Sequence, residues 1–287
     1  VALTSDQIDK LTATQVGAMS ATQVAAIESD DLALMTGAQV AAFTTAAVAN
    51  MSTDQVAALA SNQISALTTA QVKALTTDAV VALTSDQIDK LTATQVGAMS
   101  ATQVKAIESD DLALMTDNQV AAFSTAAVAN MTTDQVAALA SNQVAALTTA
   151  QVKSLTTAQM VSLTTSQIDK LTTAQLSALG TAQVAAMETQ DFAKLTTEQV
   201  ASFSATQFKA LKTSQIESLT TDQAKALTTS QLAALSTAQM KAVETQDLAA
   251  MSTTQMRAIS SANIAAMSTT QINNMTTDQV AALSNSQ

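Results

Sequence analysis

The chain has 287 residues and a net charge of −11, with 23 acidic and 12 basic residues, and it contains no His, Cys, Pro, Trp or Tyr. These absences remove disulfides, thiolate chemistry, the commonest general base and the usual protein ligands of transition metals. The acidic balance opposes binding to nucleic acid or anionic lipid. No apolar run approaches the roughly 18 residues that a membrane span needs, and the first residues do not read as a signal peptide.

One octapeptide is repeated along the whole sequence. A large apolar residue recurs every eight residues from Leu3 to Leu283 without an insertion or deletion, which gives thirty-six copies. Numbered from that residue, the octad reads Leu, Thr, Thr or Ser, variable, Gln, Val, variable, Ala, as at 67–74. A short fixed period predicts a repeat architecture in which each unit is stabilised by its neighbours.

Each octad carries the signature of a helix start. Thr at position 2 and Gln at position 5 form a capping box, in which each side chain bonds to the backbone N–H of the other residue. The next start follows eight residues later, so each helix has room for only about one and a half turns. Helical geometry places positions 1 and 6 on a common buried face, Gln at its margin, and the variable positions 4 and 7 outside. Ala at position 8 would allow neighbouring helices to approach closely.

We therefore predict an all-α fold, a solenoid of very short helices with one helix per octad. A continuous coiled coil would require about 3.5 residues per turn, whereas a period of eight corresponds to 4.0. A β-solenoid would require alternation of apolar and polar residues and Gly or Asn corners, and the octad has neither. Helices this short are unstable in isolation, so each octad must fold against others. The sequence does not fix how many octads complete one superhelical turn.

The unbroken register predicts that residues 1–287 form a single repeat array. A longer repeat is superimposed on the octad, because residues 1–80 and 81–160 differ at only eleven positions. Residues 161–287 keep the octad but diverge from the ten-octad block.

Four octads change both members of the capping box together. They carry Glu at position 2 and Asp at position 5, as Glu28 with Asp31, Glu108 with Asp111, Glu188 with Asp191, and Glu244 with Asp247. One interpretation is a cation site; the other, which we favour, is an acidic cap that suits the positive end of a helix dipole. The sequence has no calcium-loop motif of the form Asp-x-Asp-x-Asp-Gly.

Smaller departures predict weaker caps. Ala replaces Thr at Ala60 and Ala140, where we expect the following Ser61 and Ser141 to take over capping. Ala also replaces Gln at Ala47, Ala79 and Ala127. The paired threonines would also suit an ice-binding array, but half of each pair is already committed to capping.

The run Leu-Thr-Thr-Ala-Gln-Val-Lys at 67–73 and 147–153 resembles the octapeptide arrays of very large secreted or surface proteins of Gram-negative bacteria. Such proteins are often described as adhesin-like or haem-utilisation proteins. The resemblance covers the whole chain and implies an extracellular or cell-surface location without catalytic residues. Haem binding is poorly supported here, since only Met remains to ligate iron.

These observations favour a non-enzymatic structural protein that forms an extracellular filament, sheath or stalk. The alternative is a surface adhesin or binding module that uses positions 4 and 7. We predict no catalytic, cofactor-binding or metal-binding residue, no cofactor, no nucleic-acid partner and no membrane insertion. The sequence opens and closes inside an octad without a capping repeat, so we expect end-to-end or lateral self-association, or a continuing chain.

Overall fold

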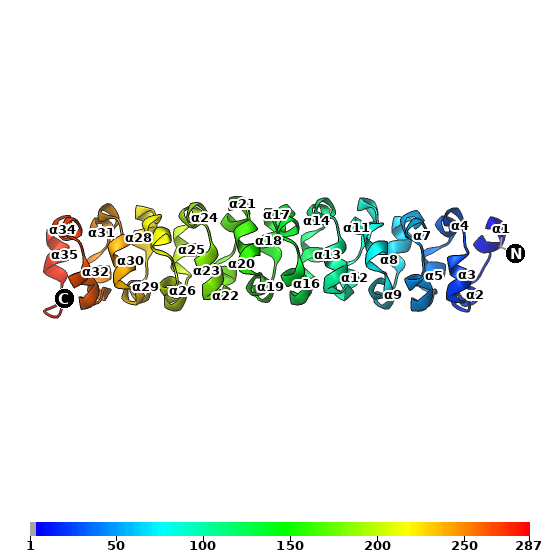
Figure 1. Cartoon of the computed structure of the whole chain (residues 1–287), viewed down its shortest axis with the longest axis horizontal. Coiled ribbons are helices and arrows are strands. Elements are labelled where there is room, and N and C mark those ends of the chain that lie inside the picture. Colours follow the sequence, from blue (N-terminus) through cyan, green and yellow to red (C-terminus); the bar gives the residue numbers. More distant parts are fainter. Residues whose placement is uncertain (1–3) are drawn as a thin grey trace. The chain divides into compact units, whose positions relative to one another are not determined.

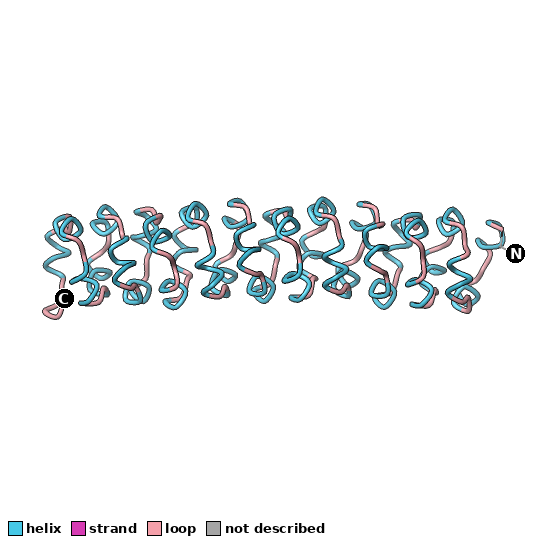
Figure 2. Tube along the Cα trace, in the orientation of Figure 1, coloured by secondary structure: helices cyan, strands magenta, loops and turns pink. Residues whose placement is uncertain are grey.

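The computed structural model describes residues 4–287, and these residues contain thirty-five α-helices and no strand. Each helix has five or six residues, and one helix lies in each of the thirty-five complete octads; the incomplete octad at 283–287 contains none. Figure 2 shows that helices and short loops alternate throughout. The predicted fold class, an all-α solenoid with one very short helix per octad, is confirmed.

The local sequence explains where a helix begins and ends. Helix α9 (Thr69–Ala74) follows Thr68, whose backbone is extended at φ −70° and ψ 157° and whose hydroxyl accepts from the Gln71 backbone N–H at 3.2 Å. The Gln71 Oε1 atom accepts from the Thr68 backbone N–H at 2.8 Å. At Leu75 the backbone is extended again, with φ −59° and ψ 135°, and the helix ends. The apolar residue of each octad therefore separates one helix from the next cap.

The described chain divides into two compact units, one ending at Leu147 and the other running from Thr148 to Gln287. The octad register continues through this point in the sequence, but the prediction of a single array over 1–287 stays a prediction. Most of the helices are labelled in Figure 1.

The helices of the first unit are α1 (Ser5–Asp9), α2 (Ala13–Gly17), α3 (Ala21–Ala25), α4 (Ser29–Leu34), α5 (Gly37–Ala41), α6 (Thr45–Ala49), α7 (Thr53–Ala58), α8 (Ser61–Ala66), α9 (Thr69–Ala74), α10 (Thr77–Val81), α11 (Ser85–Lys90), α12 (Ala93–Ala98), α13 (Ala101–Ala106), α14 (Ser109–Leu114), α15 (Asp117–Ala121), α16 (Thr125–Asn130), α17 (Thr133–Ala138) and α18 (Ser141–Ala146).

Those of the second unit are α19 (Thr149–Ser154), α20 (Thr157–Ser162), α21 (Thr165–Asp169), α22 (Thr173–Ala178), α23 (Thr181–Ala186), α24 (Thr189–Lys194), α25 (Thr197–Ala201), α26 (Ala205–Lys209), α27 (Thr213–Glu217), α28 (Thr221–Ala226), α29 (Thr229–Ala234), α30 (Thr237–Ala242), α31 (Thr245–Ala250), α32 (Thr253–Ala258), α33 (Ser261–Ala266), α34 (Thr269–Asn273) and α35 (Thr277–Ala282).

Within each unit a helix packs against the helices three places before and after it. In the first unit α5 packs against α2 and α8, and in the second α28 packs against α25 and α31. Three octads therefore complete one turn of the solenoid, and each turn contacts the turns above and below it. This is the nearest-neighbour packing on which solenoid stability depends.

The core consists of the residues at positions 1 and 6. Around α9, Leu67 is 4 % exposed, Val72 is 0 % and Leu75 is 5 %. This part of the prediction is confirmed, but the expected place of Gln at the margin is wrong. Gln71 is only 1 % exposed, so its amide belongs to the interior.

Small residues allow the stacked turns to approach closely, as expected. A methyl group added to Gly37 would lie 2.8 Å from the Ala66 side chain at position 8 of the turn above. One added to Gly97 would lie 3.1 Å from the carbonyl oxygen of Ala122, again at position 8.

We predict that Thr68→Ala lowers the local stability of the solenoid by about 0.5–2 kcal/mol, because the hydroxyl that caps α9 is lost. Amide hydrogen exchange should accelerate in α9 and in the helices that contact it. Thr69→Ala is the matched control, since Thr69 is exposed and outside the capping box. Equal acceleration along the whole chain would contradict nearest-neighbour packing.

Candidate functional site

The Gln at position 5 connects successive turns of the solenoid as well as capping its own helix. The Gln71 Nε2 atom donates to the carbonyl oxygen of Phe43 at 2.8 Å and to that of Val40 at 3.1 Å. Val40 lies near the end of α5 and Phe43 just before the cap of α6, so both belong to the preceding turn. One side chain thus caps a helix with its oxygen and ties two turns together with its nitrogen.

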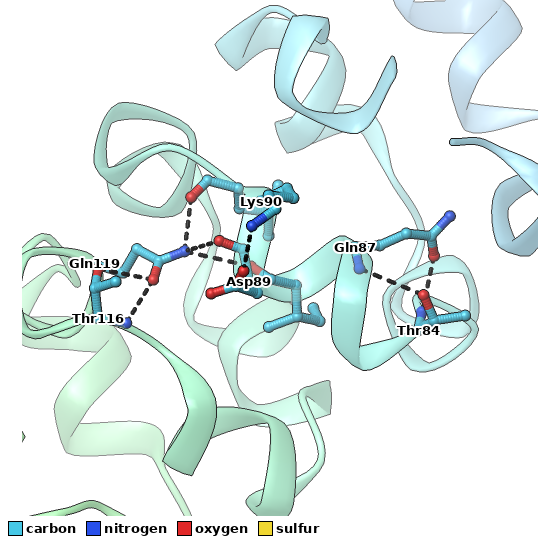
Figure 3. Close-up of polar contacts among 8 residues, drawn as sticks. Thr84, Gln87, Asp89, Lys90, Thr116 and Gln119 are labelled. Carbon is cyan, nitrogen blue, oxygen red and sulfur yellow. Dashed lines mark hydrogen bonds and ion pairs between the residues drawn. The ribbon is translucent and has the colours of Figure 1, made fainter. Parts of the chain in front are cut away.

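The same contact recurs in both units with nearly constant geometry. Figure 3 shows Gln119, at the start of α15, reaching back to the end of α11. Its Nε2 atom donates to the carbonyl oxygens of Asp89 at 3.1 Å and Leu91 at 2.7 Å. In the second unit Gln239 donates to Phe208 at 3.1 Å and Leu211 at 2.8 Å.

This contact supplies hydrogen-bond donors to backbone carbonyls that very short helices leave without a partner. The last carbonyls of any α-helix lack a partner within the helix, and here every helix has only five or six residues. A buried carbonyl without a partner costs about 1–3 kcal/mol. The Gln amide supplies a donor to these carbonyls, and among the described residues no buried side-chain nitrogen or oxygen lacks a partner.

The sequence contains a signal for this second role of Gln. A capping box accepts Glu as readily as Gln, yet no octad carries Glu at position 5. Glu would retain the capping oxygen and lose the donor. In the octads that keep Gln, the use of Gln and never Glu indicates a role for the side-chain N–H group, which the prediction from capping alone did not use.

The outermost described turns expose side chains of the kinds that are buried elsewhere in the solenoid. Gln7, Gln15 and Gln23 are exposed, and their side-chain nitrogens donate to no described residue. In the last two helices of the second unit, Ile272 and Val280 at position 6 are 41 % and 52 % exposed, unlike the buried residues at this position elsewhere.

The four Glu/Asp octads place Glu at the N-cap and Asp in the first turn of their helices. Their N-cap glutamates make no capping hydrogen bond. Glu188 and Glu244 instead accept from the Gln residues two places further on, Gln190 at 2.7 Å and Gln246 at 2.6 Å. The acidic residues therefore stand at the start of each of these helices, as the favoured interpretation expects, but without a capping hydrogen bond from the Glu side chain.

The aspartates of these octads are buried, and two of them bond to the preceding turn. The Asp191 carboxylate accepts from the Thr165 hydroxyl at 2.6 Å, and Asp247 accepts from Thr221 at 2.7 Å. Burial raises the pKa of Asp191 above its ordinary value, the Thr165 hydrogen bond opposes this, and nearby Glu188 adds to the rise. The pKa of Asp247 is raised in the same way, with Thr221 and Glu244 in the corresponding places.

The cation interpretation finds no ligand cluster. Across residues 4–287, no group of three or more Asp or Glu side chains is arranged so that it could hold a metal ion.

The remaining capping departures keep half of the box. At Ala60 and Ala140 the helix still begins at the following Ser, and no side chain caps it, so the expectation that Ser61 and Ser141 take over is wrong. The Gln63 oxygen still accepts from the Ala60 N–H at 2.6 Å. At Ala47 the opposite half survives, since the Thr44 hydroxyl accepts from the Ala47 N–H at 3.1 Å.

The outer surface offers few strong anchors for a partner. All five Phe residues are buried, whereas interface hot spots are enriched in aromatic residues. The most exposed large apolar side chains are those of Leu34, Val81 and Leu114, together with Val161 and Val280. Grooves between turns of the second unit, such as the one lined by Lys153, Gly180 and Ser204, contain mainly small and polar side chains.

Comparison with protein families identifies the repeat. The model of the ALTTAQ repeat matches nine overlapping segments: 24–61, 56–93, 104–141, 136–173, 165–197, 184–221, 206–237, 240–277 and 248–285. The chain belongs to the ALTTAQ repeat family. The family hexapeptide itself occurs at 66–71 and 146–151, where it runs from position 8 of one octad through the capping box of the next. The ALTTAQ motif thus contains both residues of the capping box and the Gln that contacts the preceding turn.

No curated protein matches the chain. Among the described helices, none combines the length and apolar character needed to cross a membrane.

Proposed function

We propose that this ALTTAQ repeat chain is a non-enzymatic structural protein that forms a filament, sheath or stalk outside the cell. The observation that carries the proposal is the Gln contact between turns, because nearly every octad devotes its one recurrent buried polar side chain to joining turns. Such a design extends by adding further turns without any change in the contact. The extracellular location rests on the resemblance to octapeptide arrays of secreted and surface proteins.

Self-association is the second part of the proposal. The contact between turns has two different faces, since the Gln amides of one turn donate to the backbone carbonyls of the turn before it, and the same contact can join turns of neighbouring chains. A contact between these two different faces is heterologous, and contacts of that kind build open filaments when they do not close into rings. The net charge of −11 opposes lateral association at low salt, so we expect end-to-end contacts to dominate.

Electron microscopy of the purified chain over a range of concentrations tests this proposal. We expect fibres or tubes that lengthen with concentration. The triple variant Gln7→Glu, Gln15→Glu and Gln23→Glu should remain folded but shorten them, because it replaces three donors with three charges. Discrete particles of constant size at every concentration would contradict assembly and would favour the alternative, a surface adhesin or binding module that uses positions 4 and 7.

A further inference from the structure

The aspartates at position 5 occupy the place of the Gln that ties two turns together. Asp191 is 4 % exposed and Asp247 is 1 % exposed, so both lie in the interior contact and not on the surface. A carboxylate has no N–H or O–H group. In its ionised form it cannot donate to the carbonyls of the preceding turn, and its only cross-turn bond is the one it accepts from Thr165 or Thr221.

Another octad of the same chain, which has Asn in place of Gln at position 5, shows which carbonyl a side chain as short as Asp can reach. Asn263 lies in α33, at position 5 of its octad, and its Nδ2 atom donates to the carbonyl oxygen of Leu235 at 2.8 Å. Leu235 is 28 residues earlier, at position 1 of the octad in the preceding turn. The corresponding carbonyls for Asp191 and Asp247 are those of Leu163 and Leu219. A protonated Asp has the same shape as Asn and gains one O–H donor.

We propose that Asp191 and Asp247 are acid-closed joints, which tie adjacent turns through a carboxylic O–H bond to Leu163 and Leu219 when protonated and lose this tie when ionised. One carboxyl oxygen keeps the hydrogen bond from Thr165 or Thr221 while the other donates. The step is a proton uptake from solvent and breaks no covalent bond.

The charged groups around each aspartate are compatible with such a joint. Near Asp191, Glu188 stands at the N-cap of α24 and Lys194 at its end. Helix α21 contributes Asp169, which pairs with Lys170 at 3.2 Å. On the other side, α27 contributes Glu217, and Lys212 precedes it beside Glu188 in a shared groove.

Near Asp247, α31 is preceded by Glu244, and α28 carries the Asp222–Lys225 pair at 3.4 Å. Helix α34 carries no titratable side chain. No cation is bonded directly to either aspartate. Nothing charged therefore compensates the ionised form within bonding distance, and burial favours the neutral form in both octads.

The sign of the effect follows from linkage. The folded-state pKa of each aspartate lies above its ordinary value. The stability contributed by the neutral form is thus fully present below the ordinary pKa and is lost as the pH rises through the raised value. Acidification from neutral pH should therefore stabilise the contact between turns at Asp191 and Asp247. Octads with Gln at position 5 should show no such effect, because the Gln amide does not titrate.

Hydrogen exchange of the full chain between pH 4 and pH 7, corrected for intrinsic rates, tests the proposal. In the natural protein, amides of α21, α24, α28 and α31 should gain protection on acidification, by up to about tenfold per pH unit for each carboxyl. In the double variant Asp191→Gln and Asp247→Gln, which restores the consensus residue, their protection should not change with pH beyond that of α29 and α30. Equal pH dependence in the natural protein and this variant would overturn the proposal.

A second variant separates the joint from a general effect of pH. Thr165→Val with Thr221→Val removes the hydroxyls that favour the ionised form, so carboxyl titration followed by NMR should move to higher pH for Asp191 and Asp247 alone. An unchanged or lower titration midpoint in a folded variant would also overturn the proposal.

Discussion

Replacing Gln71 by Glu is expected to destabilise the turns around α9 by about 2–5 kcal/mol at neutral pH, because a buried amide donor becomes a buried charge facing carbonyl oxygens. Glu has almost the same shape and retains the oxygen that caps α9. The hydrogen bond to the capping oxygen is therefore kept. The loss of stability measures the hydrogen bonds from Nε2 to the carbonyl oxygens of Val40 and Phe43. Hydrogen exchange of α5, α6 and α9 measures the effect.

The chain contains a matched control for this experiment. Gln15 forms the equivalent capping box with Thr12, its oxygen 2.8 Å from the Thr12 nitrogen. Unlike Gln71 it is exposed, and its side-chain nitrogen contacts no described carbonyl. Gln15→Glu should therefore change stability by less than about 0.5 kcal/mol, as surface substitutions usually do. If Gln71→Glu and Gln15→Glu had equal effects, the contact between turns would contribute nothing to stability.

Truncating Phe192 to Ala should cost about 3–5 kcal/mol, the usual range for removing a buried aromatic ring. Phe192 is completely buried, and its ring stacks on that of Phe203 with centroids 5.9 Å apart. Phe192 lies in α24 and Phe203 lies between α25 and α26, so the cavity would loosen the packing between neighbouring octads of the second unit. Chemical denaturation monitored by circular dichroism measures the loss.

Leu114→Ala is the control for Phe192→Ala. Leu114 is 58 % exposed although it is a large apolar residue in a helix of the same kind. Its truncation should change the free energy of unfolding by no more than about 0.5 kcal/mol. If Phe192→Ala and Leu114→Ala lowered the free energy of unfolding by similar amounts, the position of a residue in the octad would not determine its burial.

The helices and their core were predictable because the information is local. Thr68 and Gln71 specify the start of a helix by their spacing, and Val72 and Leu75 fall on one face of it. Eight residues contain this entire unit, and most octads of the sequence repeat it. Departures such as Ala60 were predicted less well, since a neighbouring Ser61 inside the helix cannot reach the geometry of the cap.

The contact between turns could not be predicted from one octad. The Gln71 amide meets Phe43, which is 28 residues earlier, and that distance depends on three octads forming a turn. How closely successive turns stack, as at Gly37 against Ala66, likewise depends on residues from different octads. Only the absence of Glu at position 5 indicated a donor there, and it did not indicate the partner.

Disulfide trapping tests the three-octad turn most directly, because the natural chain contains no Cys. Asp117 and Asn142, in α15 and α18 one turn apart, are joined side chain to side chain at 2.6 Å. The pair Asp117→Cys with Asn142→Cys should therefore oxidise rapidly to an intramolecular disulfide in the folded chain. The pair Asp117→Cys with Asp134→Cys, two octads apart, should remain reduced under the same conditions. Rapid closure of the second pair without the first would contradict the three-octad turn and every contact that depends on it.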